Sequence, residues 1–247
     1  MANARQRLHE RKAAEAKRRK AIRATIIGVI VLAVVGSAIT VAMLVQNANV
    51  APADPAGFPP NATANNDGIA FNQAEGVPVV EIYSDYQCPW CGRLEKTYGS
   101  AFTQLAAEGK IQLINHTKTF LDPSLGNDSS TNAAIGAACA DFAGVFPGYH
   151  AAVFANQPEQ EGDGYPVELL RDTIPAQLGL TGETLTAFQQ CYDTRATAGF
   201  VRQVDEAAMA AGVGSTPTVK VNGNELDLNK LFETQPADLM SLIDSVK

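Results

Sequence analysis

Residues 77–107 constrain the fold of this chain more than any other segment. Residues 77–83 are rich in β-branched and aromatic side chains, a composition typical of a buried strand. This strand pattern leads into the motif Cys88-Pro89-Trp90-Cys91, and apolar residues then recur at helical spacing from 93 to 107. The order strand, Cys-x-x-Cys, helix predicts that both cysteines lie at the beginning of a helix.

Two thiols at this spacing can form a small disulfide ring or separate into a dithiol, which suits reversible exchange. Pro89 fits the first helical position, so Cys88 is expected at the N-cap, where free N–H groups and the positive end of the helix dipole stabilise a thiolate. A lowered pKa makes Cys88 the attacking nucleophile, whereas Cys91 is shielded and resolves the mixed disulfide. We therefore predict that Cys88 and Cys91 are the catalytic residues.

Two other interpretations of this cysteine pair are open, half of a structural zinc site and an inert disulfide. A zinc site requires a second pair of nitrogen or sulfur ligands at suitable spacing. His116 and His150 are isolated in the sequence, and Cys139 and Cys191 are 52 positions apart. The spacing therefore favours redox exchange, with no metal site and no cofactor beyond the redox-active disulfide itself.

An apolar run of 22 residues without a charge, 24–45, is long enough as a helix to cross a membrane. Residues 1–23 carry nine basic and two acidic side chains, and the positive-inside rule places such an arm in the cytoplasm. We expect a basic cytoplasmic arm (1–23), a transmembrane anchor in lipid (24–45), a flexible linker (46–68) and an extracytoplasmic catalytic domain. The protein is then a single-pass protein of the cell membrane. A cleaved signal peptide is the alternative, but its apolar core is usually shorter.

Charge separates the arm from the rest of the chain. The net charge is -7, to which the first 23 residues contribute +7 and the remainder -14. A nucleic-acid-binding domain needs a basic face, so this distribution excludes that function for the main domain. A basic arm beside an apolar segment is better explained by membrane topology and contact with anionic lipid.

Beyond Gly109 the pattern returns to a strand and then becomes helical. Residues 111–118 are typical of a second strand, residues 119–216 contain mostly helical spacing, and residues 218–228 carry a hairpin signal before a final helical pattern. Strands at both ends enclose a helical insertion, which we place at about 119–212. The predicted fold class is α/β.

Three features resemble the DsbA-like branch of the thioredoxin superfamily: the sequence Tyr83-Ser84-Asp85-Tyr86-Gln87-Cys88-Pro89-Trp90-Cys91, the later Ser215-Thr216-Pro217-Thr218, and the helical insertion. The resemblance covers residues 69–247. Together with the predicted anchor, it is most similar to membrane-anchored DsbA-like thiol:disulfide oxidoreductases of actinobacterial envelopes. It implies a thioredoxin-like fold with an inserted helical domain, preceded by one transmembrane helix.

The same resemblance implies roles for the Thr216-Pro217 pair. Pro217 is expected in the cis form, facing the cysteine pair. Thr216 is expected to hydrogen-bond an extended substrate through its backbone and to tune the active site through its side chain. The local sequence leaves a trans proline at a strand edge as the alternative.

The dipeptide Pro89-Trp90, between the cysteines, is also expected to tune the active site. Trp90 is the only tryptophan in the chain. An aromatic side chain at this position covers an apolar patch, contacts substrate or affects the stability of the thiolate.

Many thioredoxin-like proteins carry a buried acid six residues before the first catalytic cysteine, but here that residue is Ile82. Glu81 should point to the opposite face of the strand unless a bulge shifts it, and Asp85 is the other nearby acid. Both acids are candidates for proton transfer. The alternative for each is an ordinary surface or loop carboxylate.

Cys139 and Cys191 fall in two helical stretches of the predicted insertion. In an oxidising compartment we expect them to form a structural disulfide. Closing a loop of about 53 residues contributes about 4 kcal/mol in the chain-entropy model. Two buried free thiols are the alternative.

These features predict a monomeric enzyme that donates its disulfide to unfolded exported proteins and is released in the reduced form. The resemblance implies a quinone-linked membrane partner that reoxidises it. Two alternatives are open. One is a disulfide reductase or isomerase, which has a more reducing potential, and the other is a tethered module that binds Cu or Zn through the cysteine pair.

Overall fold

The computed structural model describes residues 57–246. The predicted arm (1–23), the predicted anchor (24–45) and the first part of the predicted linker lie outside these residues. Within the described part of the chain, none of the helices has the length and apolar character needed to span a bilayer.

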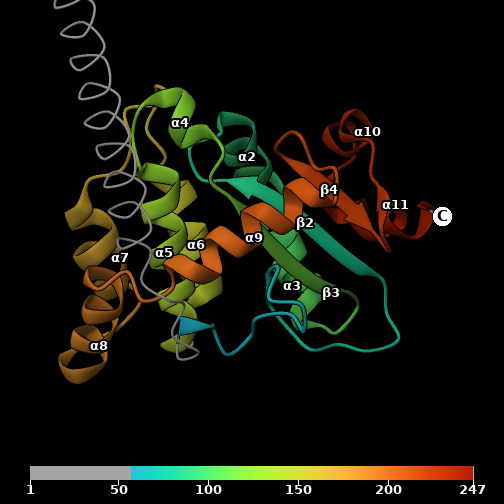
Figure 1. The fold of residues 1–247 in the computed structure, drawn as a ribbon. Coiled ribbons are helices and arrows are strands. Elements are labelled where there is room, and N and C mark those ends of the chain that lie inside the picture. The colour runs from blue at the N-terminus through green and yellow to red at the C-terminus, as the bar shows by residue number, and fades with distance from the viewer. Residues whose placement is uncertain (1–56, 247) are drawn as a thin grey trace, which may run out of the picture. The chain divides into compact units, whose positions relative to one another are not determined.

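A five-stranded mixed sheet forms the centre of the described domain (Figure 1). The strands lie in the order β1 (Ile69–Ala70), β3 (Gln112–Lys118), β2 (Val79–Asp85), β4 (Thr218–Val221) and β5 (Asn224–Glu225). β2 and β3 are parallel, whereas β1 pairs antiparallel with β3, β4 with β2, and β5 with β4. The parallel pair needs a crossover, which is supplied by the helical segment after the cysteines.

The pairing of β4 with β2 brings two distant parts of the chain together. Tyr83 of β2 pairs with Thr218, the first residue of β4. β2 ends at Asp85, just before the cysteine motif, and the Thr216-Pro217 segment directly precedes β4. Because the two strands are antiparallel, the segment that enters β4 lies beside the segment that leaves β2.

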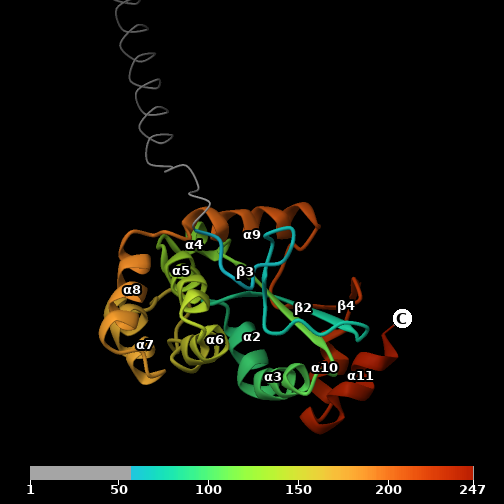
Figure 2. The same ribbon diagram turned by 90° about the horizontal axis from the view of Figure 1, so that it is seen from below.

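Helices cover both faces of the sheet (Figure 2). α9 lies on one face, and α2, α3, α10 and α11 lie on the other. Their bounds are α2 (Pro89–Leu94), α3 (Ser100–Ala107), α9 (Ala198–Ala210), α10 (Leu228–Glu233) and α11 (Leu239–Ser245). A π-helical turn, Glu95–Gly99, joins α2 to α3, and a 3-10 turn, Pro236–Asp238, precedes α11.

The helical insertion lies beside one end of the sheet (Figures 1 and 2). It contains α4 (Leu121–Leu125), α5 (Ser129–Phe142), α6 (Phe146–Ala155), a π-helical turn (Leu169–Thr173), α7 (Ile174–Gln177) and α8 (Gly182–Asp193). The insertion that the sequence predicts spans about 119–212, but α9 packs on the sheet against β3. The separate helical layer therefore ends before α9.

Two large apolar cores hold the described domain together. The first lies between the sheet and the α2–α3 side, and it buries Val80, Ile82 and Leu113. The second fills the helical insertion around Tyr149 and Phe154, and both active-site cysteines pack into it. The segment that carries the cysteines is therefore held by the sheet and by the insertion together.

The second half of the predicted linker differs from the expectation of a flexible tether. Residues 57–68 fold onto the domain: the backbone N–H and the side-chain amide of Asn61 each donate a 2.8 Å hydrogen bond to the Asp141 carboxylate. Phe58 packs edge-on against Phe200 of α9. A composition rich in Pro, Gly and Asn is typical of linkers, but it is equally typical of turns fastened by side-chain hydrogen bonds.

Candidate active site

Cys88 and Cys91 lie at the beginning of α2, as the spacing predicts. Cys88 is the N-cap residue with an extended backbone, and Pro89 occupies the first helical position. Both cysteines are free thiols in this structure. Cys88 is 7% exposed and Cys91 only 1%, so an attacking group reaches Cys88 more readily than Cys91.

The two thiols have very different acidities. A hydrogen bond with the Cys91 thiol, followed by bonds with Thr216 and the backbone N–H groups of Cys91 and Trp90, lowers the pKa of Cys88 to about 6 against the opposing effect of burial. Burial and the neighbouring Cys88 raise the pKa of Cys91 well above its usual range. At neutral pH Cys88 is therefore the thiolate and Cys91 the thiol, the division that thiol–disulfide exchange requires.

The Thr216-Pro217 segment lies against Cys88. The peptide bond between these residues is cis, and the Cys88 thiol donates a 3.4 Å hydrogen bond to the Thr216 carbonyl. The Thr216 hydroxyl is buried and has no hydrogen-bond partner within residues 57–246. This hydroxyl can therefore turn to the Cys88 sulfur when that sulfur is a thiolate, and, after the hydrogen bond with Cys91, this interaction with Thr216 also lowers the pKa of Cys88. Binding of substrate by this segment is still a prediction.

Pro89 and Trp90 lie on the surface beside the cysteines. Trp90 is 55% exposed, and its ring lies 6.0 Å from the ring of Phe232 in α10. The Arg93 guanidinium stacks 5.1 Å from the Trp90 ring and 4.7 Å from the Phe232 ring. This position suits contact with a partner protein, and it makes Trp90 a local fluorescence probe of the cysteine pair.

The two candidate acids occupy different environments. Asp85 is fully buried at the end of β2, and its carboxylate accepts hydrogen bonds from the Gln87 N–H (2.9 Å), the Ser130 hydroxyl (2.5 Å) and the Leu121 N–H (3.2 Å). Burial nevertheless raises the pKa of Asp85 to about 7, because the loss of hydration outweighs these bonds. Asp85 is therefore a buried acid that exchanges its proton near neutral pH.

Glu81 contacts groups away from the cysteines. Its carboxylate lies 3.3 Å from His116 Nε2 and accepts a 3.3 Å hydrogen bond from the Tyr83 hydroxyl. The hydrogen bond with His116 is the main cause that lowers the pKa of Glu81. Ile82 packs into the core on the α2–α3 side, and by strand alternation Glu81 faces the other way. Of the two predicted acids, Asp85 has the burial and the raised pKa that suit proton transfer, and its role in the exchange stays a prediction.

Asp85 makes stability depend on pH. Its pKa is raised on folding, so the stability that its neutral form contributes is present below about pH 4 and is lost as the pH rises through about 7. We expect a Cys88→Ser/Cys91→Ser protein to lose about 2–4 kcal/mol of unfolding free energy between pH 4.5 and 8 through this group. Urea unfolding at both pH values, with and without Asp85→Asn, measures this loss. An equal loss in both proteins would contradict it.

Sequence spacing did not reveal the polar groups that surround the cysteine loop. The buried Gln87 side chain donates 2.9 Å hydrogen bonds to Asp122, Asn127 and Ser130 of the insertion. These residues are more than thirty positions away from Gln87, and no local pattern links them to it. Their contribution is to fix the loop between β2 and α2 against the insertion.

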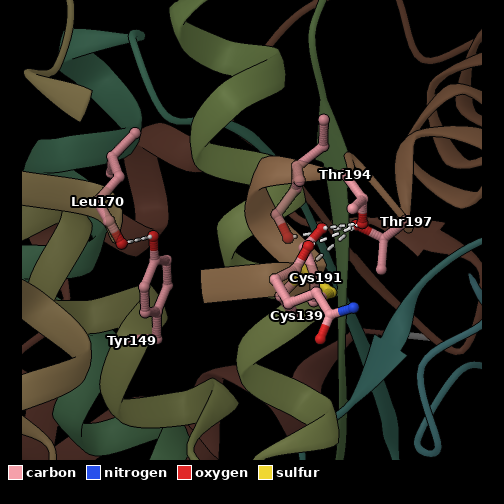
Figure 3. Close-up of a disulfide and its surroundings, with 8 residues drawn as sticks. Cys139, Tyr149, Leu170, Cys191, Thr194 and Thr197 are labelled. Atoms are coloured by element: carbon pink, nitrogen blue, oxygen red, sulfur yellow. Dashed lines mark hydrogen bonds between the residues drawn. A yellow bond between two sulfur atoms is a disulfide. The ribbon is translucent and has the colours of Figure 1, made fainter. Parts of the chain in front are cut away.

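The other two cysteines are joined in a disulfide within the insertion (Figure 3). The disulfide links Cys139 of α5 to Cys191 of α8, with the Thr197 hydroxyl 3.9 Å from the Cys139 sulfur. Nearby, the Tyr149 hydroxyl donates a 2.8 Å hydrogen bond to the Leu170 carbonyl. This bridge fastens two helices of the insertion, and its Cys139 lies nine residues beyond Ser130, the residue of α5 that contacts the cysteine loop. Among residues 57–246, no group of three His, Cys, Asp or Glu side chains is arranged to hold a metal ion.

Comparison with known proteins matches this arrangement to a family and to solved structures. The family described as thioredoxin matches residues 67–244. The chain is similar to the disulfide bond oxidoreductase DsbG from Mycobacterium tuberculosis in its reduced form, with 26% identity, a TM-score of 0.60, and coverage of 74% of this chain and 88% of that chain.

Two further solved structures are also similar. Reduced DsbA from Mycobacterium tuberculosis is 25% identical, with a TM-score of 0.59 and coverage of 73% of this chain and 92% of that chain. The thiol-disulfide oxidoreductase MdbA from Actinomyces oris is 24% identical, with a TM-score of 0.63 and coverage of 76% of this chain and 92% of that chain. At this identity the similarity shows a shared fold. A comparison with curated protein sequences finds no match.

Proposed function

Because this chain belongs to the thioredoxin family, and because it is similar to thiol–disulfide oxidoreductases, we propose that it donates its Cys88–Cys91 disulfide to unfolded exported proteins. One observation carries the direction of transfer. The pKa of Cys88 is lowered to about 6, which stabilises the reduced form of the pair. A stabilised reduced form makes the disulfide a stronger oxidant. No cofactor is needed, since the reactive disulfide belongs to the chain.

The exchange proceeds in two steps. A substrate thiolate attacks the Cys88 sulfur, the Cys88–Cys91 bond breaks, and Cys91 leaves and takes up a proton. A second substrate thiolate then attacks the substrate sulfur of the mixed disulfide, and Cys88 leaves as the stabilised thiolate. The substrate loses two electrons, and the cysteine pair gains them. The high pKa of Cys91 favours its protonation in the first step, and we propose that Asp85, whose pKa is raised to about 7, supplies that proton.

We propose that the domain works outside the cytoplasm on a single-pass membrane anchor. The support is the apolar run 24–45 and the basic residues before it, which favour a cytoplasmic N-terminus. A quinone-linked membrane protein would reoxidise the cysteine pair. Protease added to intact cells should digest the catalytic domain and leave a membrane-bound N-terminal fragment. Protection of the domain in intact cells would contradict this topology.

The direct test of the function is oxidative folding. The oxidised protein, as sole oxidant, is mixed with a reduced, unfolded secreted protein, and substrate disulfides and protein thiols are counted over time. We expect one substrate disulfide for each Cys88–Cys91 pair reduced, and none with Cys88→Ser. Faster reduction of insulin than oxidation of the unfolded substrate would favour a reductase. Stoichiometric Cu or Zn binding without exchange would favour the metal-binding alternative.

A further inference from the structure

Gln157 connects the helical insertion to the backbone of the active-site loop. It follows the end of α6, and its side-chain amide nitrogen donates 2.9 Å hydrogen bonds to the carbonyl oxygens of both Tyr86 and Cys88. α6 lies beside α2, so this short side chain bridges the two (Figure 2). One amide therefore holds the backbone on both sides of Gln87, immediately before the catalytic helix.

Each of these two carbonyl oxygens also accepts a hydrogen bond from a second donor. The Cys88 carbonyl also accepts the Gly92 N–H at 3.1 Å, which is the first hydrogen bond of the α2 turn. The Tyr86 carbonyl also accepts the Tyr165 hydroxyl at 2.6 Å. Each carbonyl oxygen thus accepts two hydrogen bonds. Both donors to the Tyr86 oxygen come from the insertion, whereas the Cys88 oxygen has one donor from the insertion and one from α2.

Gly92 makes room for this bridge. A Cβ atom at position 92 would lie 1.9 Å from Gln157 Oε1 and 2.8 Å from Gln157 Cδ, and its three nearest neighbours all belong to the Gln157 side chain. Gly92 has no positive φ that would itself require glycine. Glycine is unfavourable inside a helix, so the close approach of Gln157 is the physical reason for it at this place.

We propose that Gln157 is a positioning residue, which holds Cys88 where its sulfur meets the N–H groups of α2 and the Thr216 segment. Gln157 touches neither sulfur; it acts through the Cys88 carbonyl. Without it, the loop can move and the Cys88 thiolate loses part of the hydrogen bonding that lowers its pKa. The reduced protein is then less stable relative to the disulfide, so the protein becomes a weaker oxidant. The expected change in oxidising strength rests on the proposed function, whereas the expected change in the pKa of Cys88 does not.

The test compares Gln157→Ala, Gly92→Ala, the double variant and a matched control, Gln160→Ala, in the full-length protein. Gln160 is exposed in the same loop. The first measurement is the pH dependence of Cys88 alkylation, and the second is the equilibrium of the cysteine pair with glutathione. Both single variants should raise the alkylation pKa of Cys88 and lower the equilibrium constant for reduction by about 3- to 10-fold, whereas Gln160→Ala leaves both unchanged.

The double variant separates positioning from general damage to the fold. Once Gln157 is Ala, the atoms that would clash with a side chain at position 92 are absent. The double variant should therefore behave like Gln157→Ala alone, and Gly92→Ala should add no further defect. Additive losses in the double variant, or an unchanged alkylation pKa in Gln157→Ala, would overturn the inference.

The two measurements also separate this inference from the proposed function. If the wild-type pair shows no reversible equilibrium with glutathione, the redox function fails, while the alkylation pKa of the variants still tests positioning. If the wild-type pair is oxidising and Gln157→Ala matches Gln160→Ala in both measurements, the function stands and the positioning role is wrong.

Discussion

Replacing Cys88 with Ser is expected to reduce disulfide transfer at least about a thousandfold, because the hydroxyl of Ser neither ionises near neutral pH nor forms a disulfide. Replacing Cys91 with Ser should have a different result. Cys88 keeps its exposure and its contact with Thr216, but the residue that resolves the mixed disulfide is lost. The Cys88 thiolate can still attack a disulfide of an oxidised substrate, so that one substrate sulfur joins Cys88 and the other leaves as a thiolate. Without Cys91 these covalent adducts should accumulate, visible as reductant-sensitive bands on non-reducing gels.

The pKa difference between the two cysteines decides how this result is interpreted. Cys88 is the thiolate and Cys91 the shielded thiol, so adducts should form with Cys91→Ser and be absent with Cys88→Ser and with the double variant. Adducts of equal amount through either cysteine would contradict the assignment of Cys88 as the attacking group. Ser at either position is nearly isosteric, so circular dichroism of both variants should match the wild type.

Removing the second disulfide should have the largest effect on stability. The Cys139–Cys191 bridge closes a long loop within the insertion, and its loss in a Cys139→Ala/Cys191→Ala protein should lower the unfolding free energy by about 4 kcal/mol. Urea unfolding under non-reducing conditions measures this difference directly. Cys191 is only partly buried, so the substitution there leaves little cavity.

Activity should respond far less than stability to this double substitution. The disulfide joins Cys139, near the end of α5, to α8, whereas α5 contacts the cysteine loop through Ser130 in its first turn. At a temperature where the variant is folded, disulfide transfer per molecule should stay within about twofold of the wild type. A loss of transfer activity without a loss of stability would show that this bridge takes part in the exchange itself.

The sequence predicted those parts of the site that depend on local spacing. The strand before the motif, the N-cap position of Cys88 and the shielding of Cys91 follow from β-propensity, proline geometry and the helical period. Strand alternation likewise indicated that Glu81 turns away from the side of the sheet that Ile82 faces. Each of these features is set by neighbours within a few residues.

What the sequence could not predict depends on distant partners. The pKa of Asp85 is raised because the fold buries its carboxyl group, and Gln157 lies 69 residues beyond the Cys88 carbonyl that it holds. The short helices α4 and α10 have too few turns to show a clear period. Residues 57–68 have a linker composition, yet Asn61 fastens them to Asp141. Tertiary contacts override local preference at each of these positions.

The reduction potential of the Cys88–Cys91 pair tests the central claim most directly. The fluorescence of Trp90, the only tryptophan, reports the state of the pair as the full-length protein equilibrates in glutathione buffers. The pKa of Cys88, about 6, is lower than the value of about 7 in thioredoxin, so we expect a potential less negative than about -270 mV, the value of thioredoxin. A potential near or below -270 mV would contradict disulfide donation and identify a reductase.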